Sequence, residues 1–146
     1  MSEQYDANAL AETFIYEQYK ADAILPQFPI WPDQGDANTP RPFITYAQQE
    51  YGRDTQPMGA FGIIDFTTFI YRVSAFADDQ SSAVLSLIQK RLLSALHGQQ
   101  LLSYGDGQML SCRRVGIGRG PDLVQGRIGT HSFSFWEILV QEGPIG

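Results

Sequence analysis

The spacing of apolar residues predicts two helices. Over residues 80–97 these residues recur with a helical period, which places them on one core-facing side: Val84, Leu85, Ile88, Leu92, Leu93 and Leu96. Asp78-Asp79 can cap the start of this helix, and Gly98 suits its C-terminal end. A shorter stripe of Leu10, Phe14 and Ile15 predicts a second helix over residues 6–23, which must end before Pro26.

Four stretches have the composition of β-strands. They are residues 43–46, 63–76, 109–117 and 127–140, and the second is the richest in β-branched and aromatic side chains. In that stretch Phe69, Tyr71 and Val73 alternate with a second apolar set on the opposite face, Phe66, Ile70 and Phe76. A central strand explains two apolar faces, and so does a strand whose second face is covered by another subunit.

The remaining segments are predicted to be irregular. Residues 25–42 contain five prolines, which favours an extended segment pinned to the core or to a neighbouring subunit. Residues 47–62 are predicted to form a long polar loop, and the glycine-rich residues 116–126 a hairpin tip. The order of elements predicts a single α+β domain over residues 1–146, with a mostly antiparallel four-stranded sheet and two helices packed on one face.

Composition excludes several classes of function. Only 18% of the residues are charged, and the net charge is −6. Nucleic-acid binding needs clustered Lys and Arg to neutralise phosphates, and here the basic residues are few and scattered. No stretch has the length and apolarity of a membrane span or the pattern of a signal peptide, so a cytoplasmic origin is expected.

No motif indicates catalysis, a metal or a cofactor. His97, His131 and the single cysteine, Cys112, lack the spacing of zinc ligands. The glycines of 116–120 lack the spacing of a nucleotide-binding loop and precede Pro121 and a strand rather than a helix. We therefore expect a protein that is not an enzyme and carries neither cofactor nor metal.

The chain holds more apolar and aromatic material than one small domain needs to bury. Aromatic residues, Met and Arg are enriched at protein–protein interfaces. The candidate interface residues come from the proline-rich segment, the two predicted loops and the final strand; they are Phe28, Trp31, Arg53, Met58, Arg119 and Trp136. A single well-filled core would account for part of this surplus.

Four stretches carry a resemblance to a known family. They read RPFITY, GIIDFTTFIYRVSAF, DDQSSAVLSLIQKRLLSAL and HSFSFWEILVQ, in that order along the chain. Together with the N-terminal helix and the proline-rich segment, this order resembles the tail terminator proteins of tailed bacteriophages and the related neck or head–tail joining proteins. The resemblance extends from about residue 7 to residue 141.

The resemblance implies a virion protein, assembled in the host cytoplasm. It would form a ring, typically of six copies, that caps the tail tube, ends its polymerisation and offers a docking surface to the neck and head. Its partners would be copies of itself, the tail tube protein and a neck or head connector protein, and DNA would pass through without being specifically bound. A neck adaptor or another connector subunit is an alternative, a small-molecule-binding module a lesser one, and an enzyme built from scattered residues a third.

Overall fold

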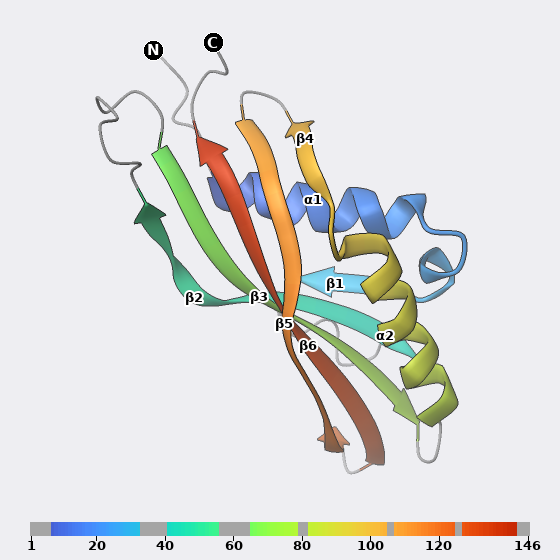
Figure 1. Cartoon of the computed structure of the whole chain (residues 1–146). Helices are drawn as coiled ribbons and strands as arrows, with labels where there is room; N and C mark the ends of the chain where they lie inside the picture. Colours follow the sequence, from blue (N-terminus) through green and yellow to red (C-terminus); the bar gives the residue numbers. More distant parts are fainter. Residues whose placement is uncertain are drawn as a thin grey trace.

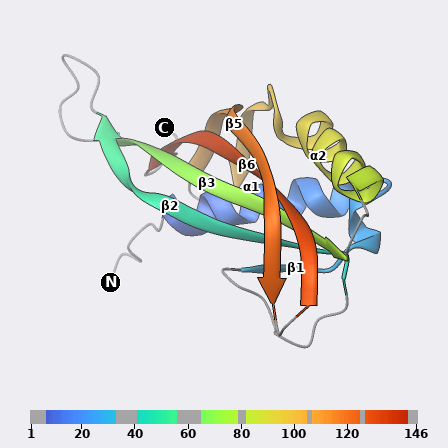
Figure 2. The ribbon, with the colours of Figure 1, turned by 90° about the horizontal axis from the view of Figure 1, so that it is seen from below.

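The computed structural model describes residues 7–32, 41–55, 65–78, 82–104, 107–124 and 127–142. The described residues form a mixed sheet of six strands in the order β1-β2-β3-β6-β5-β4. Only β1 (Ile30–Pro32) and β2 (Phe43–Thr55) run parallel. All other neighbours are antiparallel, and the long strands twist strongly across one another (Figure 1, Figure 2). The bounds of these strands are β3 Asp65–Asp78, β4 Gln100–Tyr104, β5 Gly107–Val124 and β6 Arg127–Glu142.

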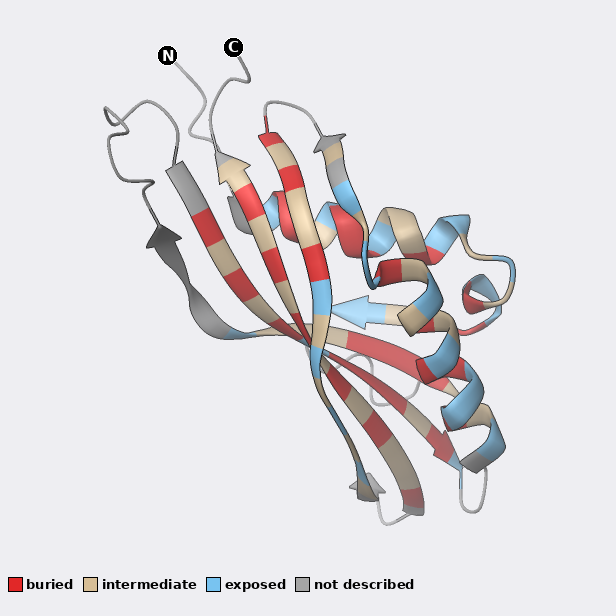
Figure 3. Ribbon diagram, viewed as in Figure 1, coloured by how far each residue is buried: buried red, intermediate tan, exposed pale blue. Residues whose placement is uncertain are grey.

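Both helices contribute to one core on a single face of the sheet. α1 (Ala7–Ala21) supplies Phe14 and Ile15, and α2 (Ser82–Leu96) supplies Leu85, Ile88 and Leu92, all of them buried. The alternating burial along β3 and β6 is visible in Figure 3. Gly98 follows α2 with a φ of 81°, the left-handed conformation that ends many helices. Neither described helix has the length and apolarity to cross a membrane.

The α+β class and the two helices are confirmed, and the strand count is corrected. The helices predicted over 6–23 and 80–97 occupy Ala7–Ala21 and Ser82–Leu96, and the strand predicted over 63–76 occupies Asp65–Asp78. The prediction of four strands is wrong, because β1 and β4 join the sheet as short edge strands. The single domain over residues 1–146 stays a prediction.

Two segments predicted as loops are strands. The polar residues 47–55 extend β2. Backbone pairing with β3 keeps them in a strand, although their sequence does not alternate between apolar and polar residues. The rest of that loop, residues 56–62, lies outside the described residues. Residues 116–124, predicted as a hairpin tip, continue β5 along β6. The strand predicted over 127–140 is confirmed as β6.

Residues 25–32 of the proline-rich segment pack against the core through Leu25 and Phe28. A short 3₁₀ helix, η1 (Leu25–Gln27), precedes β1. The Tyr19 hydroxyl on α1 donates to the Phe28 carbonyl oxygen, and both side chains are buried. Asp22 accepts hydrogen bonds from the backbone N–H groups of Ile24 and Leu25 at 2.9 and 3.0 Å. These contacts attach the segment to this chain's own core; residues 33–40 lie outside the described part.

Candidate interaction surfaces

The structure separates the six predicted interface residues into three groups. Phe28 and Trp136 are 7% and 0% exposed, so their side chains pack inside the chain. Trp31 is 37% exposed on the edge strand β1, and Arg119 is exposed on β5. The Arg53 side chain and Met58 lie outside what the structure describes. Of the described candidates, Trp31 and Arg119 are therefore placed where a partner could reach them, and their interface role stays a prediction.

The buried Trp136 side chain is held in place by a hydrogen bond as well as by apolar packing. Its indole Nε1–H donates to Ser134 Oγ at 2.8 Å, and Ser134 Oγ donates to the Val73 carbonyl oxygen at 3.4 Å. Both side chains are fully buried on the helix-facing side of β6. A buried indole N–H needs such a partner, since an unmade hydrogen bond there costs stability.

The sheet face opposite the helices carries a row of aromatic rings. Successive ring centroids along the row lie 5.0 to 5.6 Å apart, and its members are Phe43, Phe76, His131, Phe133 and Phe135. Four of the five are only partly buried; Phe43 alone is below one tenth exposed. The row crosses from β2 through β3 to β6, and it is a continuous apolar band on the side that the helices leave open.

The glycines of β5 make room for this aromatic row. Gly116, Gly118 and Gly120 pair with Phe135, Phe133 and His131. A Cβ added at Gly118 would stand 2.3 Å from Phe133 Cζ, whereas one at Gly120 would have nothing nearer than 3.6 Å. The Phe133 ring therefore covers the Gly118 backbone, an arrangement known to stabilise glycines in sheets.

Alanine substitutions at these two glycines are expected to differ. Gly118→Ala should lower the free energy of unfolding by about 1–3 kcal/mol, because the Phe133 ring must leave its place in the row. Gly120→Ala, two residues along the same face, should be neutral or stabilising by up to about 1 kcal/mol, since it only restricts the unfolded chain. Urea denaturation of both variants measures this difference. Equal urea midpoints for the two variants would show that the position of the Phe133 ring does not depend on Gly118.

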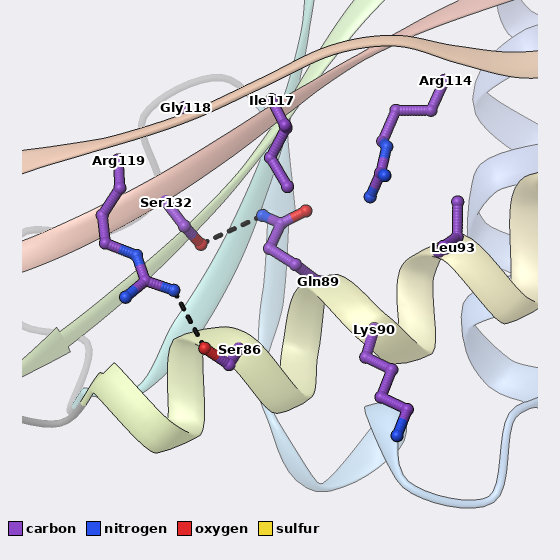
Figure 4. Close-up of a pocket in the computed structure, with 9 residues that line it drawn as sticks. All are labelled: Ser86, Gln89, Lys90, Leu93, Arg114, Ile117, Gly118, Arg119 and Ser132. Atoms are coloured by element: carbon purple, nitrogen blue, oxygen red, sulfur yellow. Dashed lines mark hydrogen bonds between the residues drawn. The ribbon is translucent and has the colours of Figure 1, made fainter.

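A groove lies between α2 and β5 on the helix-facing side of the sheet. Its volume is about 470 Å³. The side chains that line it come from α2, β5 and β6, and Figure 4 shows them: Ser86, Gln89, Lys90, Leu93, Arg114, Ile117, Gly118, Arg119 and Ser132. The lining holds three basic residues and no acidic one, in a chain whose net charge is −6. The groove is thus a local positive site on an acidic protein.

Polar groups in the groove are fixed by hydrogen bonds across it. Arg119 Nη2 donates to Ser86 Oγ at 2.9 Å, and Gln89 Nε2 donates to Ser132 Oγ at 3.0 Å (Figure 4). Gln89 is 5% exposed, yet its Oε1 has no hydrogen-bond partner among the described residues. The Gln89 amide oxygen points away from Ser132 into the space beside Arg114 (Figure 4). An unpartnered buried acceptor is unusual in a folded protein.

The buried cysteine does not add reactivity. Burial raises the pKa of the Cys112 thiol to about 12, so the thiolate is scarce at neutral pH. Within the described ranges, no group of three or more His, Cys, Asp or Glu residues is placed to hold a metal ion. The groups that the described residues bring to the surface are aromatic rings, strand edges and cations.

Comparison with known proteins shows a shared fold. No family model and no curated protein matches the chain. Among solved structures, it is similar to a chain of one described as "Virion of native gene transfer agent (GTA) particle". The two chains are 14% identical, with a TM-score of 0.62 over 86% of this chain and 91% of the other. At this identity the likeness shows that the two chains have the same fold.

Proposed function

We propose that the protein is a structural component of a tailed-phage-like virion. In this role, six copies form a ring that caps the tail tube, ends its polymerisation and provides the docking surface for the neck and head. The observation that carries the proposal is the fold shared with a chain of a gene transfer agent virion particle, over nearly the whole length of both chains. The resemblance of the sequence to tail terminators and neck proteins agrees with it.

The surfaces described above support an assembling role rather than a chemical one. The aromatic row on the open sheet face and the exposed Trp31 offer apolar area to partners. A ring requires each copy to present two different contact surfaces. The net charge of −6 would let DNA pass through such a ring without being held. The partners proposed are copies of this chain, the tail tube protein and a neck or head connector protein.

A neck adaptor is the alternative within the same class. The shared fold supports it equally, because it too would be a ring at the head end of the tail. The two roles differ in the partner that binds first: a terminator binds the free end of a tail tube, and an adaptor binds the head connector. A small-molecule-binding module is a separate alternative, favoured only by the groove between α2 and β5.

The proposal is tested by assembly on tail tubes. The purified protein is mixed with tail tubes from the same phage, and light scattering and negative-stain imaging measure its oligomeric state and its place. We expect six-fold rings at one end of each tube, and shorter tubes when the protein is present during polymerisation. A protein that stays monomeric at high concentration and binds no tube contradicts the proposal. Binding to head connectors alone would favour the adaptor.

A further inference from the structure

Strand β5 has an edge that no described strand covers. Strand β4 pairs with β5 only as far as Ser111, and the backbone N–H of Arg114 donates to His97 Nδ1 at 3.1 Å. Beyond this point, residues 116–120 pair with β6 on one side and with no described strand on the other. Pro121 follows in the sequence and has no backbone N–H. Residues 116–120 are therefore an edge of ordinary strand length that can accept one more strand.

This edge and the groove form one surface. A register shift between Arg114 and Gly116 leaves Val115 as an extra residue of β5. Residues 114 and 117 would face opposite sides of a regular strand, but here Arg114, Ile117 and Arg119 all line the groove. Ile117 is also 56% exposed, the highest value among the large hydrophobic residues described. A strand added to this edge would therefore direct alternate side chains toward the groove.

The groove presents cations that have no carboxylate beside them. Arg119 lies at one end and Arg114 at the other, and Lys90 lines the groove from α2 (Figure 4). No described carboxylate forms an ion pair with any of the three. The chain as a whole has a net charge of −6, so this concentration of positive charge is local. It favours a ligand that brings negative charge to the groove.

The buried Gln89 amide lies between the two arginines in Figure 4. Its side chain is 5% exposed, and its Oε1 has no hydrogen-bond partner among the described residues. The Ser132 hydroxyl that accepts from Gln89 Nε2 can also donate, so the amide can turn end for end and keep this bond. The amide thus offers the groove either an acceptor for a backbone N–H or a donor for a carboxylate. A ligand that supplies the missing partner removes the cost of a buried polar atom without one.

The other face of the same edge is apolar. The Phe133 ring covers Gly118, and Phe135 Cδ2 would lie 3.2 Å from a Cβ at Gly116. Both rings are only partly buried. A strand beside β5 would therefore place the side chains of its second face against these two rings. That face of the incoming strand should be apolar, as cross-strand packing on aromatic rings requires.

We propose that residues 116–120 of β5 bind an extended segment of another protein, in which acidic residues alternate with apolar ones. The segment adds a strand to the sheet, directs its carboxylates toward Arg114 and Arg119, and packs its apolar side chains on the aromatic row. The alternation follows because successive side chains of a strand face opposite sides. This inference does not depend on the ring role, since it concerns a binding surface that one copy presents by itself.

An acidic protein segment fits this surface better than nucleic acid or a small anion. Phosphates would match the cations, but a nucleic acid backbone cannot continue the hydrogen bonding of a strand edge, and the net charge of the chain opposes it. A small anion would occupy the groove and leave the strand edge and the aromatic face uncovered. Only an extended peptide uses the edge, the cations and the apolar face together.

Peptide binding to the full chain tests this site. The probe is a short blocked peptide of alternating glutamate and valine, titrated at pH 7 while amide NMR spectra of the protein are recorded. We expect shifts and slower hydrogen exchange centred on the amides of residues 116–120. Arg119→Gln and Gln89→Met should each weaken binding about tenfold and change the melting temperature by no more than about 3 °C. Arg113→Gln is the matched control, because Arg113 pairs with Glu137 and does not line the groove.

Modified peptides separate charge from strand pairing. A peptide with lysine in place of glutamate should not bind at about 1 mM, and one with methylated backbone nitrogens should bind at least about tenfold more weakly, because it cannot pair. Failure of the glutamate peptide to bind at about 1 mM overturns the proposal. Equal binding of the methylated peptide, or binding that neither Arg119→Gln nor Gln89→Met weakens, overturns it as well.

Two further results would assign the edge to another occupant. Single-stranded DNA that shifts the same amides and binds more tightly than the peptide would replace the acidic segment by nucleic acid. Self-association that Ile117→Lys abolishes, in a protein that binds no peptide, would replace it by a second copy. These measurements use the protein without tail tubes, so their outcome and that of ring assembly are decided separately.

Discussion

Replacing Trp136 with alanine is expected to lower the free energy of unfolding by about 3–5 kcal/mol. The indole is fully buried between the helices and the sheet, and its removal leaves a large cavity and the Ser134 hydroxyl without its donor. Since small domains are stable by only about 5–15 kcal/mol, the variant should be partly unfolded at 37 °C. Urea denaturation followed by circular dichroism gives the difference.

Trp31 provides the matched control. It is the other of the chain's two tryptophans and is 37% exposed on an edge strand. Trp31→Ala should change the free energy of unfolding by no more than about 1 kcal/mol. In addition, fluorescence of the Trp31→Ala variant, which reports Trp136 alone, should resist quenching by iodide. A strongly quenched Trp136, or equal losses of stability in the two variants, would contradict the burial of this side chain.

Replacing Asp22 with alanine is expected to lower the free energy of unfolding by about 2–3 kcal/mol. The Asp22 carboxylate accepts from Arg91 Nη2 at 2.8 Å and from Arg91 Nε at 3.2 Å, besides the two backbone N–H groups that open η1. Its side chain is 5% exposed and that of Arg91 is 32% exposed. One carboxylate therefore connects α2 to the turn after α1, and its loss leaves several donors without an acceptor.

The same group should make stability depend on acid pH. Burial alone would raise the pKa of Asp22, but the hydrogen bonds from Arg91, Leu25 and Ile24 and the Arg91 charge outweigh it, so the pKa lies below its ordinary value. Its ionisation thus stabilises the fold fully above the unfolded value of about 3.9, and this contribution is lost as pH falls through the lowered folded pKa. Asp22→Asn should remove this part of the acid dependence.

Glu17 is the control for Asp22. It pairs with Lys20 at 3.2 Å on the surface of α1, and both side chains are nearly half exposed. Exposed pairs of this kind contribute about 0.3–0.5 kcal/mol, so Glu17→Gln should leave both the urea midpoint and its acid dependence close to those of the unaltered protein. If Asp22→Asn and Glu17→Gln followed the same curve between about pH 2 and pH 7, the special role of Asp22 would be excluded.

The periodic parts of the fold could be predicted from the sequence. Leu85, Ile88 and Leu92 are buried on one face of α2, as their spacing indicates, and Tyr71 and Val73 face the helices while Phe76 faces away. These elements can be recognised from the spacing of their apolar residues, because each has one face that is buried in the core. The segments of residues 47–55 and 116–124 carry no such signal: their strand conformation comes from pairing with β3 and β6, partners distant in the sequence.

The burial of two candidate interface residues could not be predicted, for a related reason. Phe28 and Trp136 are of residue types that are common at interfaces, but both side chains are buried. The burial of Trp136 depends on the register of β6, and that of Phe28 depends on the turn that the Tyr19 hydroxyl bonds to. The glycines of β5 suggest a turn, yet their role is steric and becomes visible only with the rings of Phe133 and Phe135 placed across from them. The groove combines α2 with β5, and the sequence gives no sign that these two elements lie together.

The register shift at Val115 determines which side chains of β5 face α2 and which face the aromatic row. Arg114 pairs with Trp136 and Gly116 with Phe135, so Val115 is an extra residue between them. Deleting this one residue would remove the bulge but leave Gly116 opposite Phe135 and Ile117 opposite Ser134, so Ile117 and Arg119 would still face α2. In evolution, β5 should therefore tolerate loss of the extra residue better than a single-residue insertion after it, which would turn the later side chains to the opposite face. Natural gains of length should collect in the connections between strands.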